Sequence, residues 1–176
     1  SEFDIIFNAS KLKFLVCIHG KLRSMFNNLN GCLFYIGGRP IENVASYSHL
    51  GHIINCHSDD KDDVLQRRRN FTVQANNVFC FFKTLDMHIK IKLFKSYCSS
   101  IYGSELWALE DDVIQDFCCS WRTVIRRLLN LPFNAHCFLL PILTGTLPVF
   151  DEICKRSSRF INSCLRSRNN LVHIIA

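Results

Sequence analysis

The chain has 176 residues, of which 48% are hydrophobic, and it carries a formal net charge of +6 at pH 7. This composition supports a buried core and excludes a disordered tail or a low-complexity segment. The longest apolar runs, such as Phe14–Ile18, are far too short to cross a bilayer, so we expect a soluble protein with no membrane partner.

The positive charge is confined to one end of the chain. Residues 1–116 contain 13 Lys and Arg and 13 Asp and Glu, whereas residues 117–176 contain 8 basic residues and only Asp151 and Glu152. An excess at one end favours an anionic partner for that end, although a solvated basic helix face produces the same pattern.

The N-terminal part of the chain predicts short strands. Runs of apolar and β-branched residues cover Lys13–Ile18, Cys32–Ile36, a stretch near Val44, and Leu50–Ile54. Gly37–Gly38 can adopt the positive φ angles of a hairpin turn. These features predict a small antiparallel sheet.

Beyond this region, apolar residues recur at three- and four-residue spacing and predict helices. The predicted ranges are Asp60–Leu85, Met87–Leu109, Asp111–Leu129 and Val149–Arg168. Ser58 and the following aspartates supply a cap and an acidic first turn, Gly103 interrupts the second helix, and Pro132 stops the third. The fold class is therefore α+β, with a small antiparallel β region followed by a mostly α-helical bundle.

The third helix has the clearest periodicity in the chain. Its apolar stripe is formed by Val113, Phe117, Trp121, Val124 and Leu128. Arg122, Arg126 and Arg127 fall off the stripe, so we expect them to face solvent. In the last helix we expect Ile153, Phe160, Ile161 and Cys164 to be buried, after a connection over residues 141–148 that is punctuated by Pro and Gly.

Two acidic or metal-like patterns have simpler interpretations. Asp111 and Asp112, within Leu109–Ile114, resemble a catalytic carboxylate pair, but their position at a helix start favours an acidic first turn. His49, His52, Cys56 and His57 match no standard zinc spacing, and ordinary hairpin and loop residues are the better interpretation. The ten cysteines are interpreted as reduced thiols, most of them buried.

The basic residues carry the functional hypothesis that residue chemistry supports by itself. Contacts with phosphate groups are expected from Arg67, Arg68, Arg69, Arg122, Arg126, Arg127, Lys155, Arg156, Arg159 and Arg166. The alternative is that these long cationic side chains are the solvated faces of helices.

Five motifs occur in a fixed order along the chain. They are Phe7–Lys11, Tyr47–Ile54, Leu93–Cys98, Tyr102–Trp107, and Trp121–Arg122 continuing to Leu131–Pro132. In this order and spacing they resemble the C-terminal part of the reverse transcriptase of non-LTR (LINE-type) retrotransposons. The resemblance covers essentially the whole chain.

The resemblance implies three regions. Residues 1–57 would be the end of the palm and a primer-holding hairpin, residues 58–132 a helical thumb-like module, and residues 133–176 a C-terminal helical extension. It implies that Tyr47, His49, Leu50 and Gly51 lie near the primer. It also implies binding of an RNA–DNA template–primer duplex by Arg67, Arg68, Arg122, Arg126, Arg127, Arg156 and Arg159.

The resemblance implies an RNA-directed DNA polymerase as the parent enzyme. Its Mg²⁺ ions would be held by carboxylates upstream of residue 1, so we expect this fragment to hold no cofactor and to be inactive alone. Lys11 matches a late-palm lysine, for which a leaving-group role has been proposed across polymerases, but Leu12 replaces the serine that usually follows it in the family. The first residues show no initiator Met and no signal pattern, in line with a fragment.

Expected partners are the duplex and the missing N-terminal part of the polymerase, and the expected location is intracellular, in the cytoplasm or the nucleus. Two alternatives remain open. The chain can be a non-enzymatic helical module that binds a protein partner, or the functionless relic of a retroelement reading frame.

Overall fold

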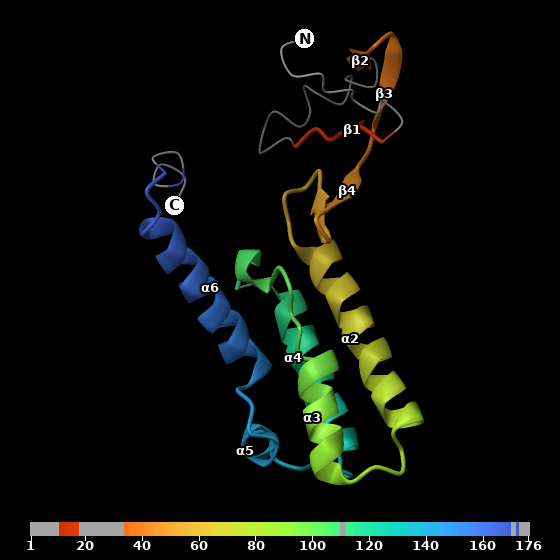
Figure 1. The fold of residues 1–176 in the computed structure, drawn as a ribbon, viewed down its shortest axis with the longest axis vertical. Helices are drawn as coiled ribbons and strands as arrows, with labels where there is room; N and C mark the ends of the chain where they lie inside the picture. Colours follow the sequence, from red (N-terminus) through yellow and green to blue (C-terminus); the bar gives the residue numbers. More distant parts are fainter. Residues whose placement is uncertain (1–10, 18–33, 110–111, 170–171, 173–176) are drawn as a thin grey trace. The chain divides into compact units, whose positions relative to one another are not determined.

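The computed structural model describes residues 11–17, 34–109, 112–169 and 172. The chain divides into two compact units, Ser1–Asp62 and Asp63–Ala176. The first unit contains the strands, and the second contains nearly all of the helical structure (Figure 1). The α+β class predicted from the sequence is confirmed.

The strands of the first unit form two sheets. Strands β1 (Lys13–Phe14), β2 (Phe34–Ile36) and β3 (Arg39–Asn43) form one sheet in the order β1-β3-β2. Strands β4 (Ser46–His49) and β5 (His52–Asn55) form a separate antiparallel hairpin. The prediction of one antiparallel sheet is wrong in two details, because the strands form two sheets and because β1 pairs with β3 in parallel. Ile18 and Cys32, which end and begin two predicted strands, lie outside the described residues.

The β4–β5 hairpin turns over two residues. Leu50 and Gly51 have φ angles of 51° and 80°, the pair of positive values that a two-residue type I′ turn requires. The predicted strand Leu50–Ile54 therefore starts two residues later than expected, because its first two residues form the turn. In the hairpin, Tyr47 pairs with Ile54 and His49 with His52.

A side-chain network joins the hairpin to the start of helix α2 (Lys61–Phe81). The amide of Asn55, a residue 4% exposed, donates to Oδ1 of Asp59 at 2.8 Å and to Oδ2 of Asp62 at 3.1 Å. Oδ1 of Asp59 also accepts from the backbone N–H of Lys61. The hydrogen bond from Asn55, followed by the backbone bond and charge of Lys61, lowers the pKa of Asp59. The acidic start of this helix is thus fixed by Asn55.

Three helices of eleven or more residues and a short 3-10 turn follow α2 in the described part of the chain. They are α3 (Met87–Tyr97), the 3-10 turn η3 (Ser104–Leu106), α4 (Asp112–Leu128) and α6 (Val149–Leu165). Helix α2 ends four residues before the predicted Leu85. The prediction of one helix from Met87 to Leu109 is wrong, because α3 ends at Tyr97 and Gly103 adopts a φ of 83°. Consecutive serines and a glycine favour turns over a helical interior, which explains this early end.

The connection before α6 contains a sixth element that the sequence reading missed. Helix α5 spans Leu139–Thr144, and Gly145 ends it with a φ of 61°. In α6, Val149, Ile153 and Ser157 are buried, whereas Phe160 and Ile161 are 43% and 53% exposed. The predicted burial of Phe160 and Ile161 is wrong, since the C-terminal half of α6 diverges from α4 (Figure 1).

The core of the second unit is an aromatic cluster. Phe71 of α2 lies edge-on to Phe94 of α3 and to Phe117 of α4, with ring centroids 6.0 Å and 5.6 Å apart. Trp107 meets Phe117 at 6.1 Å in the same geometry. The predicted stripe of α4 is confirmed at Phe117 and at its three following members, while Val113 is only half-buried. The stripe therefore fixes α4 at the centre of this unit.

Nine cysteines lie in the described part of the chain, and all are free. Cys98 and Cys118 are buried, but Cys17, Cys80, Cys119 and Cys137 are exposed, so the prediction that most are buried is wrong. Among the described residues, no helix has both the length and the apolar character needed to span a membrane.

Candidate nucleic-acid interface

The hairpin gathers several residues predicted to lie near a primer. Tyr47 is 40% exposed, His49 is exposed, and Leu50 at the turn is 77% exposed. Tyr47 and His49 are two positions apart on β4, so they share one face of the hairpin. Leu50 combines a large apolar side chain with a positive φ, a conformation that non-glycine residues rarely adopt. The tip of the hairpin therefore presents aromatic and apolar groups to solvent.

Lys11 lies in a turn of the first unit and is exposed, and Leu12 is half-buried beside it. The rest of the Phe7–Lys11 motif lies outside the described residues.

Two of the three predicted binding arginines of α2, Arg67 and Arg68, are engaged within the protein, whereas Arg69 is exposed. The Nε atom of Arg67 lies 3.9 Å from Oδ2 of buried Asp63, and its guanidinium lies over the ring of Tyr102 at 5.5 Å. Nη1 of Arg68 donates to Oδ2 of Asp116 on α4 at 3.3 Å. These contacts tie α2 to its neighbours, and a phosphate would have to compete with them.

Arg126 of α4 is held by the segment that follows the helix. Its Nε and Nη2 atoms donate to the carbonyl oxygen of Ala135 at 3.1 Å and 2.9 Å, and Nη2 lies 3.1 Å from Sγ of Cys137. The guanidinium also lies 5.6 Å from the ring centroid of Phe133. Arg126 is half-buried, so the prediction that it faces solvent is wrong.

The two other arginines of α4 differ from each other. Arg127 is exposed as predicted, yet it donates to Oδ1 of Asn76 at 3.2 Å and lies over the ring of Phe79 at 4.8 Å. Arg122 is half-buried, against the prediction, and its Nη1 lies 3.9 Å from Sγ of Cys119. Each arginine on α4 therefore has a contact inside the second unit.

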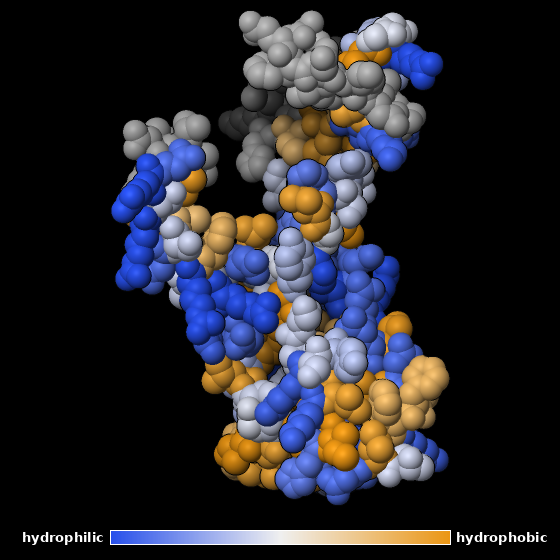
Figure 2. Space-filling view, in the orientation of Figure 1, coloured by the Kyte–Doolittle hydropathy of each residue, from blue (hydrophilic) through white to orange (hydrophobic). Residues whose placement is uncertain are grey.

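A different pattern holds on α6. Arg159 and Arg166 are exposed, and among the described residues no hydrogen bond or ion pair engages their guanidinium groups. With Asn162, Ser163 and Ser167 they line one surface hollow. Spacings of three, four and seven residues place these side chains on one face of the helix. Figure 2 shows strongly hydrophilic residues gathered along α6.

Arg156, also on α6, is half-buried, and its guanidinium contacts other groups of the second unit. Its Nε donates to Oε1 of Glu152 at 3.3 Å, and its Nη1 donates to the carbonyl oxygen of Ile101 at 3.1 Å. Lys155 lies 3.7 Å from Oε2 of the same glutamate and is exposed. Lys155 precedes Arg159 by one turn, so it extends the cationic face of α6 toward its N-terminus.

The residues considered as metal ligands are not assembled. Throughout residues 11–17, 34–109, 112–169 and 172, no group of three or more His, Cys, Asp and Glu side chains is placed to hold a metal ion. Asp112 occupies the first turn of α4, as the acidic-turn interpretation requires, while Glu110 and Asp111 lie outside the described residues.

The structure thus sorts the predicted cations into two groups. Arg67 and Arg68 of α2 and the three arginines of α4 contribute to packing, and Arg69 of α2 is exposed. Arg159 and Arg166 form an open face together with polar residues that the sequence analysis did not single out. The sequence feature that indicates Asn162 and Ser163 is their spacing of three and four residues from Arg159, which places them on the same helix face. Comparison with models of known protein families, with curated proteins and with solved structures finds no match.

Proposed function

We propose that the chain is a non-catalytic, nucleic-acid-binding part of a non-LTR retrotransposon reverse transcriptase. In this role it holds the phosphate backbone of an RNA–DNA template–primer duplex. The observation that carries the proposal is the face of α6 on which Arg159 and Arg166 are exposed and have no partner among the described residues.

A phosphate group is bound best by cationic side chains that are not already bound to an acceptor within the protein. An arginine that already holds a carboxylate or carbonyl oxygen must give up that bond, whereas Arg159 and Arg166 have no such cost in the described structure. Seven helical residues separate the two, which is about 10 Å along the helix axis. This spans about three nucleotides of one strand of a duplex, at about 3.4 Å for each nucleotide.

The polar residues beside the arginines suit the same role. Asn162 and Ser163 offer neutral donors, and side chains of this kind commonly contact phosphate and sugar oxygens. Such contacts carry no sequence information, so binding is expected to be independent of base sequence.

The hairpin has a separate part in the proposal. Tyr47, His49 and Leu50 present aromatic and apolar surface suited to the end of a primer, where an unpaired base can stack. Magnesium belongs to the parent polymerase in this proposal, and its carboxylate ligands are assigned to a segment outside this chain.

The proposal is tested by measuring binding of a fluorescent RNA–DNA hybrid by anisotropy over a series of salt concentrations. The test variant is Arg159→Gln with Arg166→Gln. The control is Lys83→Gln with Lys92→Gln, which removes the same charge from exposed positions outside α6. Each lost phosphate contact lowers the slope of log K against log salt by about 0.9, so the test variant should lose about two in slope.

The result expected is weaker, less salt-dependent binding by the test variant and nearly unchanged binding by the control. The proposal is overturned if the unmodified chain fails to bind the hybrid at low salt. It is also overturned if the two double variants bind alike.

A second candidate function rests on a separate observation. Large apolar side chains are exposed on α5 and the segments that flank it, namely Phe133, Phe138, Ile142, Leu143 and Leu147. Exposed apolar patches of this kind often mark protein-interaction surfaces. This favours the alternative of a non-enzymatic module that binds a protein partner or a second copy of itself.

The second candidate predicts association that is insensitive to salt. Sedimentation of the purified chain should show a concentration-dependent dimer that Ile142→Ser abolishes and that high salt preserves. If the chain is a monomer at all concentrations, its partner must be a different protein. The exposed patch should then bind a hydrophobic-surface dye, and Ile142→Ser should remove that binding.

A further inference from the structure

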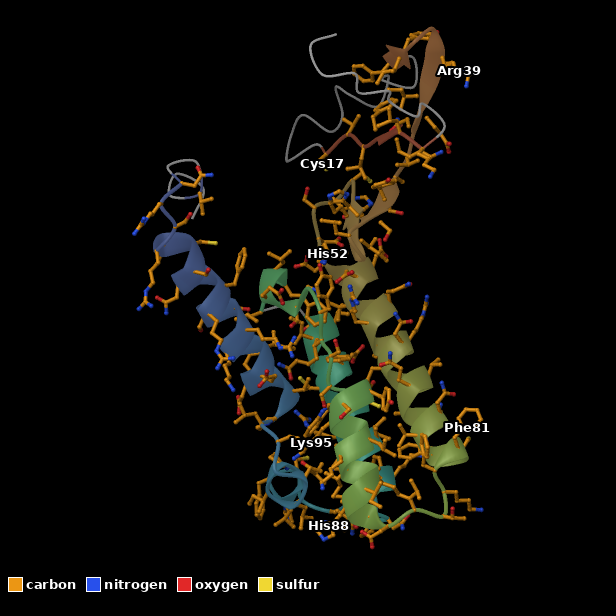
Figure 3. The ribbon with its side chains drawn as sticks, viewed as in Figure 1. Cys17, Arg39, His52, Phe81, His88 and Lys95 are labelled. Atoms are coloured by element: carbon orange, nitrogen blue, oxygen red, sulfur yellow. The ribbon has the colours of Figure 1, made fainter. Side chains whose placement is uncertain are left out.

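A cavity of about 570 Å³ lies within the second unit, between α3, α4 and the N-terminal part of α6. Lys155 and Arg156 of α6 line this cavity, whereas Arg159, Asn162 and Arg166 do not. Figure 3 shows Lys95 on the side of α3 that faces the segment between α5 and α6. The cavity is therefore distinct from the open face formed by Arg159 and Arg166.

Three cations and one carboxylate line this cavity. Lys95 comes from α3, Lys155 and Arg156 come from α6, and the carboxylate is Glu152. Side chains from two helices thus place a net positive charge around one space, which favours an anionic ligand over a cationic one.

The two lysines retain donor capacity. Nζ of Lys95 donates one hydrogen bond, to the carbonyl oxygen of Gly145 at 3.1 Å, and an ammonium group has three protons to donate. Nζ of Lys155 lies 3.7 Å from Oε2 of Glu152, beyond ordinary hydrogen-bond length. Both lysines line the cavity and are exposed, so each can reach a ligand.

Hydroxyl groups complete the polar wall. Ser96, Ser99 and Ser100 line the cavity, and their side chains make no hydrogen bond within the described part of the chain. A hydroxyl can donate to a phosphate oxygen without adding charge. The combination of two ammonium groups that can still donate hydrogen bonds and three serine hydroxyls matches a group with several strong acceptor oxygens.

The floor of the cavity is apolar. Phe71, Phe117 and Trp121 form it, and all three belong to the buried core. The cavity volume lies within the range of about 300–1,000 Å³ typical of small-molecule sites, and is more than a bare inorganic anion fills. A ligand with a phosphate group and an organic body matches both the polar wall and the apolar floor of the cavity.

We propose that this cavity binds a small organic phosphate monoester, with Lys95 and Lys155 holding the phosphate group and the organic body lying over Trp121. The proposal does not depend on duplex binding, because the cavity and the open face of α6 use different residues for their main contacts. It adds a small-molecule ligand to the chain whether or not the chain binds nucleic acid.

The test is isothermal titration calorimetry of the whole chain with three phosphate monoesters and their phosphate-free counterparts. The pairs are adenosine monophosphate with adenosine, ribose 5-phosphate with ribose, and phenyl phosphate with phenol. The variants are Lys95→Gln and Lys155→Gln. The control is Lys92→Gln, an exposed lysine of α3 that does not line the cavity. Thermal unfolding of each variant checks that it is folded.

At least one monoester should bind while its counterpart does not, and each cavity variant should lose about tenfold in affinity, the effect of one charge-assisted hydrogen bond. The Lys92→Gln control should bind as tightly as the unmodified chain. The proposal is overturned if none of the three monoesters binds, or if a counterpart binds as tightly as its phosphate ester. Cavity variants that match the control would also overturn it.

Discussion

The indole nitrogen of Trp107 donates a 2.8 Å hydrogen bond to Oδ2 of Asp63, which lies 44 positions earlier and is fully buried. Arg67 lies beside the same carboxylate at 3.9 Å and over the ring of Tyr102. The pair connects the first turn of α2 to the η3 segment. The motif Tyr102–Trp107, which contributes to the family resemblance, thus forms a packing contact in the second unit.

Trp107→Phe removes the indole donor from this buried carboxylate. We expect it to lower the free energy of unfolding by about 2–4 kcal/mol, because a buried charged acceptor loses a partner and the core loses volume. Trp121→Phe is the matched control, since Trp121 is buried but its indole nitrogen donates to no described residue. Urea unfolding of both variants measures the difference. Equal losses would show that the hydrogen bond to Asp63 adds nothing beyond packing.

Arg126→Gln should destabilise the protein rather than weaken duplex binding. Two hydrogen bonds from its guanidinium to the Ala135 carbonyl are lost, which costs about 1–2 kcal/mol. Arg159→Gln removes the same charge from an exposed position and should change stability by less than about 0.5 kcal/mol. Thermal melting and hybrid binding are compared for the two variants. The prediction fails if Arg126→Gln melts like the unmodified chain.

The stability of the first unit should fall at acidic pH through Asp59. Because the hydrogen bond from Asn55 lowers the pKa of Asp59 in the folded state, the unfolded chain takes up a proton first as the pH falls. The stabilising contribution is therefore present above the ordinary value of 3.8 and is lost as the pH drops below it. Asp59→Asn should remove this part of the pH dependence in a series of unfolding measurements. An unchanged acid profile in the variant would contradict the assignment to Asp59.

The cysteines should differ sharply in their reactivity. Burial raises the pKa of Cys98 to about 11 and also raises the pKa of Cys118, so both remain protonated thiols at neutral pH. Iodoacetamide should label them slowly in the native state. Cys119 neighbours Cys118 in sequence but is exposed, so it provides an internal control. Mass spectrometry of peptides over a time course measures each rate, and equal labelling of Cys118 and Cys119 would refute the prediction.

Local patterns in the sequence were sufficient where local forces decide the structure. The stripe from Phe117 to Leu128 predicted α4 to within one residue, because a helix with one apolar face has a single orientation that buries it. The end of α4 before Pro132 followed from the backbone preference of proline.

The burial and the hydrogen-bond partners of individual side chains could be determined only from the tertiary structure. Phe160 and Ile161 continue the apolar pattern of α6, yet they are exposed because α6 diverges from α4 along its C-terminal half. Conversely, Arg126 falls off the apolar stripe, yet a turn nine residues away supplies its hydrogen-bond acceptor. The periodicity of apolar residues defines the apolar face of a helix, but it does not show which segment packs against that face.

The sequence by itself determined the α+β class, the position of α4, and the excess of positive charge in the C-terminal third. The tertiary structure decided which of those charges are free, leaving Arg159 and Arg166 open while Arg126 and Arg156 hold partners. It also decided that Lys95 and Lys155, 60 positions apart, line one cavity. The reason is that hydrogen-bond partners and cavity walls come from segments distant in sequence, and only packing of the core brings them together.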